Sequence, residues 1–320
     1  MAQFKNLKDL LTKFQDEQAC RDFLVQHRWN GVPVCPYCGS NKSYKIENGK
    51  RFKCANKECH KKYSVTVGTV AEDSNIALST WFGAIYLVSS HKKGISSIQL
   101  GKDLGIAQKT AWFMLHRIRE SMKGGNSPLT AKEVEADETF VGGKNLNRHI
   151  DKRHYDENGK EIDLKFTVMG MIEPGGEVRT KSVSGPTKKN ATEFLEMNLL
   201  KTTNLVTDAS PIYSKIGRKY NHVVINHSAG IYKFEGHTTN HMENYWSVLK
   251  RGIYGIYHQV SHKHLQRYCD EFAFRFNSRK MKDNDRFELS LSRLTGRLTY
   301  ADLVAKHEEI DNIGLMPNGE

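Results

Sequence analysis

The 320-residue sequence lacks any hydrophobic run long enough to cross a membrane. A spanning helix needs about 20 consecutive apolar residues, and the best candidate, Trp81 to Val88, is far shorter. The N-terminal residues are charged and amphipathic, without the apolar core of a signal peptide. We therefore expect a cytoplasmic protein without membrane contact, and the 38% hydrophobic content is enough for a globular core.

Cysteine is also scarce, and four of the six cysteines lie within residues 35–59. A cluster of this kind in a cytoplasmic protein fits metal binding better than disulfide bonding. Acidic residues are few at the front of the chain, where residues 1–125 hold 20 Lys and Arg against 10 Asp and Glu. This excess accounts for +10 of the net charge of +12. It indicates a polyanionic partner, most simply nucleic acid, with a solubilising surface as the alternative.

The clustered cysteines form two pairs with the spacing of a zinc ribbon. Cys35 and Cys38 form a CxxC knuckle, and Cys54 and Cys59 follow with four residues between them. Four thiolates close a tetrahedral Zn²⁺ site and leave no open position, so the predicted zinc is structural. His60 in place of Cys59 remains an alternative ligand. The intervening hairpin is rich in lysine and is a candidate for contacts with a DNA backbone.

Helical periodicity covers residues 76–122, and Gly105 interrupts it. The pattern of helix, glycine-containing turn and helix predicts a helix-turn-helix, although an ordinary helical hairpin has the same pattern. Residues 121–130 then form a linker rich in small residues. In a helix-turn-helix, the second helix would place near base edges Gln108, Lys109 and Thr110, and near phosphates His116, Arg117 and Arg119.

The pattern after the linker alternates between strands and helices and predicts a mixed sheet. Asp137 is predicted to follow a first strand, and Asp208 ends a later one. Acids at the carboxyl ends of strands can converge, and with Glu243 on a later helix they could hold two Mg²⁺ or Mn²⁺ ions for phosphoryl transfer. Glu135 and Glu138 are competing candidates beside Asp137. Helical spacing aligns Glu243 with Lys250, which could hold a phosphate.

Several motifs together resemble the DDE-type transposases of bacterial insertion sequences, the ISXO-like group with an N-terminal zinc ribbon ahead of a ribonuclease H-like domain. The resemblance covers about Phe23 to Arg279. It implies that Asp137, Asp208 and Glu243 are the metal-binding acids and that Lys250 contacts transposon-end DNA. Arg251, the next residue, is a further candidate at the DNA channel. The motifs are CPYCGS with SVTVGT, ADETFVGGK, LVTDAS and the stretch that begins TNHMENYWSVLKR.

We therefore expect an α/β protein that binds the terminal inverted repeats of its element, cuts the ends and joins them to target DNA. Two ends must be handled together, so a homodimer or larger assembly is expected. A DNA-binding regulator that does not cut and a structure-selective nuclease of the same fold are the alternatives. The expected division is an N-terminal helical segment (1–30), zinc ribbon (31–72), helix-turn-helix region (73–124), catalytic domain (125–290) and C-terminal tail (291–320).

Overall fold

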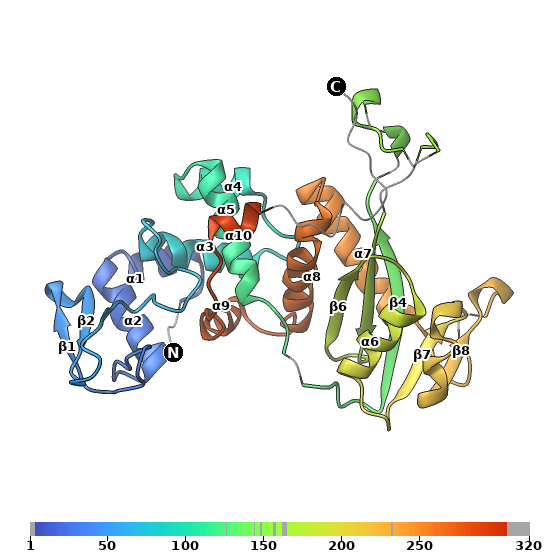
Figure 1. Ribbon diagram of the computed structural model, residues 1–320, viewed down its shortest axis with the longest axis horizontal. Helices are drawn as coiled ribbons and strands as arrows, with labels where there is room; N and C mark the ends of the chain where they lie inside the picture. Colours follow the sequence, from blue (N-terminus) through green and yellow to red (C-terminus); the bar gives the residue numbers. More distant parts are fainter. Residues whose placement is uncertain are drawn as a thin grey trace. The chain divides into compact units, whose positions relative to one another are not determined.

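The computed structural model forms two compact units (Figure 1). The first unit contains Met1–Lys123 and Ser278–Val304, and the second contains Gly124–Asn277 and Ala305. The sequence-based division carried the catalytic domain to residue 290, whereas Ser278–Val304 packs with the first unit. The residues that the structure describes are 4–125, 127–143, 145–147, 149–155, 158–161, 165–231 and 233–305.

The first unit is built around the apolar helix α3 (Leu78–Ser90), which is buried along most of its length. The ring of Phe82 packs edge-on against Phe14, Phe23 and Phe287. Phe287 lies on α9, so aromatic packing holds the segment after residue 278 in this unit. The other helices of this unit are α1 (Leu7–Lys13), α2 (Glu17–Trp29), α4 (Ser97–Leu104), α5 (Gln108–Ser121), α9 (Asp283–Ser292) and α10 (Tyr300–Val304).

A small antiparallel sheet with strand order β1-β2-β3 carries the clustered cysteines. Its apolar contacts are few, with the rings of Phe52 and Tyr63 packed against Trp29 of α2. A core this small cannot hold a fold by itself. The strands are β1 (Ser43–Ile46), β2 (Arg51–Cys54) and β3 (Lys62–Tyr63), with a 3₁₀ turn at Glu47–Gly49.

Helices α4 and α5 meet at the predicted glycine turn. Gly105 has φ 66°, the left-handed conformation that ends a helix and favours glycine. Ser96 caps the start of α4 by accepting a hydrogen bond from the backbone N–H of Gln99. The predicted helix, turn and helix are present, and their DNA-binding role stays a prediction.

The second unit is a five-stranded mixed sheet with strand order β6-β5-β4-β7-β8. Strands β4, β5 and β6 pair antiparallel, whereas β4, β7 and β8 are parallel. This topology confirms the predicted ribonuclease H-like class. The strands are β4 (Glu133–Val141), β5 (Phe166–Ile172), β6 (Val178–Val183), β7 (Asn204–Asp208) and β8 (Asn221–Ile225).

Helices cover both faces of this sheet (Figure 1). Alternation along β4 divides its side chains, so that Val134 and Ala136 pack with α6 (Lys188–Asn198) while Val141 packs with α7 (Asn240–Gly252) and α8 (His262–Asn277). A π-helical turn, Ile253–Tyr257, follows α7. The short 3₁₀ turns are Asn145–Asn147, Ile150–Lys152, Pro211–Tyr213, Ile216–Lys219 and His227–Ala229.

The outer edge of β6 is occupied by two side-chain amides from α8. Asn277 accepts from the N–H of Val178 at 2.8 Å and donates to its carbonyl at 3.0 Å. Gln266 accepts from the N–H of Ser182 at 2.7 Å and donates to the carbonyl of Thr180 at 3.2 Å. The amides thus replace the hydrogen bonds of a further strand.

Gly170 on β5 leaves the space that α7 fills. It pairs with Asp137 in the register of β4 and β5, and a Cβ at this position would lie 2.3 Å from Met242 and 2.6 Å from Trp246. We expect Gly170→Ala to lower the free energy of unfolding of the second unit by about 1–3 kcal/mol, because overpacking displaces α7. Urea unfolding measures this loss. Gly185→Ala, which meets nothing within 4 Å, is the control, and equal stability of both variants would contradict the expectation.

Candidate active site and metal centres

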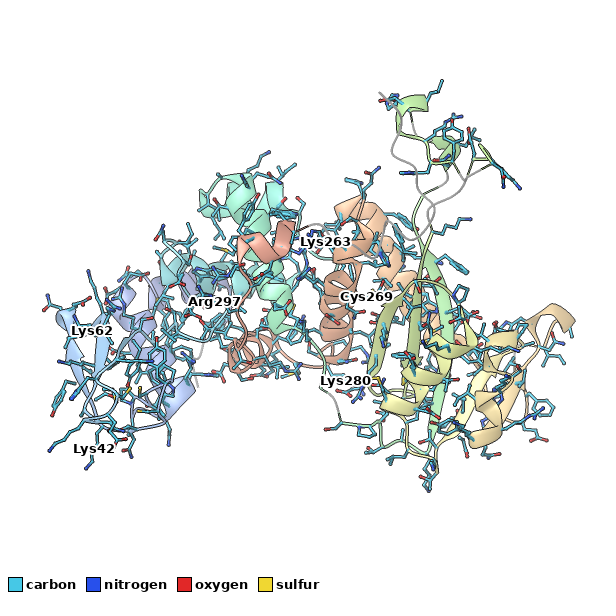
Figure 2. All side chains as sticks on the ribbon, in the orientation of Figure 1. Lys42, Lys62, Lys263, Cys269, Lys280 and Arg297 are labelled. Atoms are coloured by element: carbon cyan, nitrogen blue, oxygen red, sulfur yellow. The ribbon has the colours of Figure 1, made fainter. Side chains whose placement is uncertain are left out.

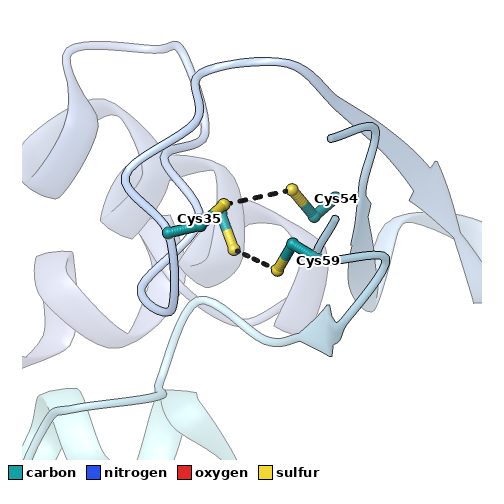
Figure 3. Close-up of side chains that lie close together, drawn as sticks. Cys35, Cys54 and Cys59 are labelled. Atoms are coloured by element: carbon teal, nitrogen blue, oxygen red, sulfur yellow. Dashed lines mark hydrogen bonds between the residues drawn. The ribbon is translucent and has the colours of Figure 1, made fainter. Parts of the chain in front are cut away.

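The four clustered cysteines converge in the first unit. The sulfur of Cys35 lies 3.8 Å from that of Cys59, and the sulfur of Cys38 lies 3.5 Å from that of Cys54. Figure 3 shows the side chains of Cys35, Cys54 and Cys59 turned toward one another. All four sulfurs belong to one group within 4.8 Å, so the structure brings Cys59 to the cluster.

The geometry of this group fits a structural zinc ion. Tetrahedral coordination with Zn–S bonds of about 2.3 Å separates the sulfurs by about 3.8 Å, close to the observed distances. A hydrogen bond from the backbone N–H of Ser40 lowers the pKa of Cys38 to about 7, which favours the thiolate that a metal needs. Burial raises the pKa of Cys54 to about 11, so its thiolate depends on the positive charge of a bound metal. Four sulfur donors leave no position for a substrate, so the centre is structural.

A second group of candidate ligands lies at the carboxyl end of β7, next to β4. Carboxylate oxygens of Asp137, Glu138 and Asp208 all lie within 4.8 Å of one another. The parallel pairing of β4 and β7 runs to Ala136 and Thr207, so Asp137 and Asp208 are the next residues on the two strands. Glu138 points to the opposite face of β4 but reaches the group because β7 ends at Asp208.

The electrostatics of this group favour a cation. Burial, followed by the negative charge of Asp208, raises the pKa of Asp137 from 3.8 to about 7. Burial also raises the pKa of Glu138. Across the described part of the chain, no Lys or Arg forms an ion pair with Asp137 or Glu138. Three hard oxygen donors that repel one another are a suitable donor set for a divalent metal such as Mg²⁺ or Mn²⁺.

Neighbouring donors orient these carboxylates. Ser210 joins two of them, because its backbone N–H donates to Asp208 Oδ1 at 3.0 Å and its hydroxyl donates to Glu138 Oε1 at 3.0 Å. The buried Tyr213 hydroxyl donates to Glu138 Oε2 at 2.9 Å. From the other face, Trp246 Nε1 donates to Asp137 Oδ2 at 2.9 Å. The sequence motifs predicted Asp137 and Asp208 as ligands, but nothing in them pointed to these orienting residues.

Glu243 is not part of the carboxylate group that the described residues form. It lies in the first turn of α7 with 52% of its side chain exposed, and its Oε1 is 3.6 Å from His227 Nδ1. Trp246, which contacts Asp137, is one helical turn further along α7. The helix that carries Glu243 is therefore attached to Asp137. Glu138 adds to Asp137 instead of replacing it, and Glu135 is buried under α7.

The predicted DNA contacts differ in exposure. Gln108 and Lys109 are exposed on α5 and Thr110 is half-buried; Arg251 is exposed on α7 and Lys250 is half-buried. On the ribbon, Lys42 and Lys62 are exposed, as Figure 2 shows.

The position of Arg117 contradicts its predicted contact with DNA phosphates. It is 5% exposed, lies over the rings of Trp81 and Phe113, and donates to the carbonyl of Glu72. His116 and Arg119 are also buried. These side chains stabilise the first unit and are not available to phosphates.

Comparison with known proteins identifies both parts of the chain. Residues 15–62 match the transposase zinc-ribbon domain, and residues 129–277 match the ISXO2-like transposase domain. A protein described as an uncharacterized protein in transposable element ISH50 of Halobacterium salinarum is 29% identical over 133 residues. That match covers 40% of this chain and 43% of the relative. No helix in the described residues is long and apolar enough to cross a membrane. The chain thus carries the two domains of the zinc-ribbon-bearing DDE transposases of insertion sequences, as its motifs predicted.

Proposed function

We propose that this protein is a transposase that binds the terminal inverted repeats of its insertion sequence and catalyses metal-dependent strand cleavage and strand transfer. The observation that carries the proposal is the convergence of Asp137 and Asp208 at adjacent strand positions inside the matched transposase domain. Their mutual repulsion and the raised pKa of Asp137 suit a site that takes up a divalent cation.

The proposed ligands of Mg²⁺ or Mn²⁺ are Asp137 and Asp208, with Glu243 as the third acid. A metal held by these acids would lower the pKa of an attacking water or 3′-hydroxyl and would stabilise the leaving oxygen. The protein supplies orientation: Trp246 fixes Asp137, and the N–H of Ser210 fixes Asp208. One arrangement serves both reactions, because in each an oxygen nucleophile attacks a DNA phosphate. The nucleophile is water in cleavage and a DNA 3′-hydroxyl in strand transfer.

DNA binding is proposed for the exposed cationic and polar side chains. The ribbon lysines would contact phosphates, and Gln108, Lys109 and Thr110 would read base edges. Lys250 and Arg251 follow Glu243 on α7, so they would hold DNA next to the metal site. Double-stranded DNA of the element ends and of the target is the proposed partner. Because two ends react together, the active form is proposed to be a homodimer or larger assembly.

The proposal is tested with a labelled duplex that carries an end of the protein's own insertion sequence. We expect the wild type to cut this duplex in Mg²⁺ or Mn²⁺ and to join the end to target DNA. Glu243→Ala should lower the cleavage rate by about a hundredfold or more, since a third ligand fixes the ion. Glu138→Ala, compared at matched DNA binding, decides whether Glu138 supplies that third ligand.

Glu193→Ala is the matched control, because Glu193 is an exposed acid on α6 across the sheet. It should cleave as the wild type does. If Glu138→Ala is inactive and Glu243→Ala is not, the third acid is Glu138. If the wild type binds the end but never cuts it, the protein is a DNA-binding regulator. Cutting without preference for the end sequence would instead indicate a structure-selective nuclease.

A further inference from the structure

Three acids on one face of β4 each contact a side chain from residues 237–246. Residues at alternate positions of a strand point to the same face. Residues 237–246, which include the start of α7, are therefore joined to one face of β4 by a row of polar contacts. The pairs are Glu133 with His237 Nδ1 at 2.5 Å, Glu135 with His241 Nδ1 at 2.6 Å, and Asp137 with Trp246 Nε1 at 2.9 Å.

Glu135 is the central member of this row and is fully buried. Its Oε2 accepts hydrogen bonds from the backbone N–H groups of His241 and Met242, both at 3.0 Å. The N–H groups of a first helical turn lack the usual acceptor one turn back. The N–H of Met242 is shared between Glu135 and the carbonyl of Thr239, 3.1 Å away, and Thr239 at the start of α7 makes no side-chain cap. A carboxylate from β4 therefore caps α7, where the helix dipole favours negative charge.

The position of this cap connects it to the metal site. Glu243 directly follows Met242, and Asp137 is two residues along β4 from Glu135. We propose that Glu135 is a positioning residue, which holds the first turn of α7 against β4 so that Glu243 can meet the ion bound by Asp137 and Asp208. This inference rests on the proposed function. Glu135 itself is engaged by α7 and lies outside the carboxylate group of Asp137, Glu138 and Asp208.

Binding of Tb³⁺ alone tests the inference without relying on DNA cleavage. Trp246 is the one tryptophan of the second unit and hydrogen-bonds to Asp137, so tryptophan excitation should sensitise Tb³⁺ at the site. Trp246→Phe gives the background signal. We expect Glu135→Gln to weaken Tb³⁺ binding about tenfold, as residues that orient metal ligands commonly do. An amide cannot accept all the hydrogen bonds that the carboxylate accepts.

A double-variant comparison separates positioning from simple stabilisation. Glu243→Gln alone should also weaken Tb³⁺ binding, and adding Glu135→Gln to it should have little further effect, because both changes remove the same ligand. Leu249→Val, which loosens the buried face of α7, should lower the melting temperature and leave Tb³⁺ affinity unchanged. Additive losses, or wild-type affinity in Glu135→Gln, would overturn the inference.

Two further variants keep the outcome interpretable. If Glu135→Gln does not fold, His241→Ala removes the imidazole contact alone and should weaken Tb³⁺ binding about threefold, the effect of one lost hydrogen bond; unchanged affinity there would overturn the inference. Asp208→Asn tests the site itself. If it binds Tb³⁺ as the wild type does, the proposed metal site fails. If it loses binding while Glu135→Gln retains it, the metal site stands and the positioning role is wrong.

Discussion

Asp208→Asn is expected to bind element-end DNA as the wild type does and to cut it about a thousandfold more slowly or not at all. Metal stabilisation of the transition state contributes several kcal/mol, and each 1.36 kcal/mol corresponds to about a tenfold change in rate. The measurement is single-turnover cleavage of labelled duplex in Mg²⁺, with binding followed separately by anisotropy.

The geometry explains why this substitution should spare the fold. Asn has the size of Asp and keeps an oxygen that can accept the hydrogen bond from the N–H of Ser210. It removes one of the negative charges that attract the cation, the charge that adds to burial in raising the pKa of Asp137, so the variant should lose metal binding without losing stability. Glu193→Gln changes an exposed acid by the same charge and should cut normally. A rate for Asp208→Asn within tenfold of wild type would remove Asp208 from the metal site.

Cys54→Ser is expected to abolish zinc binding and to unfold the ribbon at residues 31–72. Zinc binding supplies about 10 kcal/mol or more to small domains of this kind. The ribbon has little else, because its buried apolar cluster consists of Phe52 and Tyr63 with the cysteines themselves. Zinc content by atomic absorption and limited proteolysis of the ribbon measure the effect. DNA binding should fall together with the loss of the folded ribbon.

Cys269→Ala is the control for this experiment. Cys269 is fully buried in the second unit and takes no part in the four-sulfur group. Its replacement should leave one zinc ion per chain. If Cys54→Ser kept its zinc and its resistance to protease, another side chain would have to supply the fourth ligand, and the ribbon would not depend on Cys54.

Local spacing predicted the parts of the sites that depend on neighbours along the chain. The paired cysteines could be identified because each pair lies on a short turn, and Asp208 because it ends an apolar strand. The sequence does not indicate which face of α5 the rest of the unit covers. Arg117 was therefore predicted to contact a phosphate, whereas in the structure it lies over the rings of Trp81 and Phe113. The role of Glu138 depends on Ser210 and Tyr213, more than 70 residues away.

The occupied edge of β6 affects how this protein can associate. An exposed strand edge recruits extended segments of other chains, which leads to aggregation or exchange of strands between molecules. Asn277 and Gln266 already bind four of the backbone groups on β6 with which an incoming strand would pair. Intermolecular β-pairing is therefore blocked on that side of the sheet by the side chains of a single helix. Among the described strands, β8 forms the other edge of this sheet, where a further strand could pair.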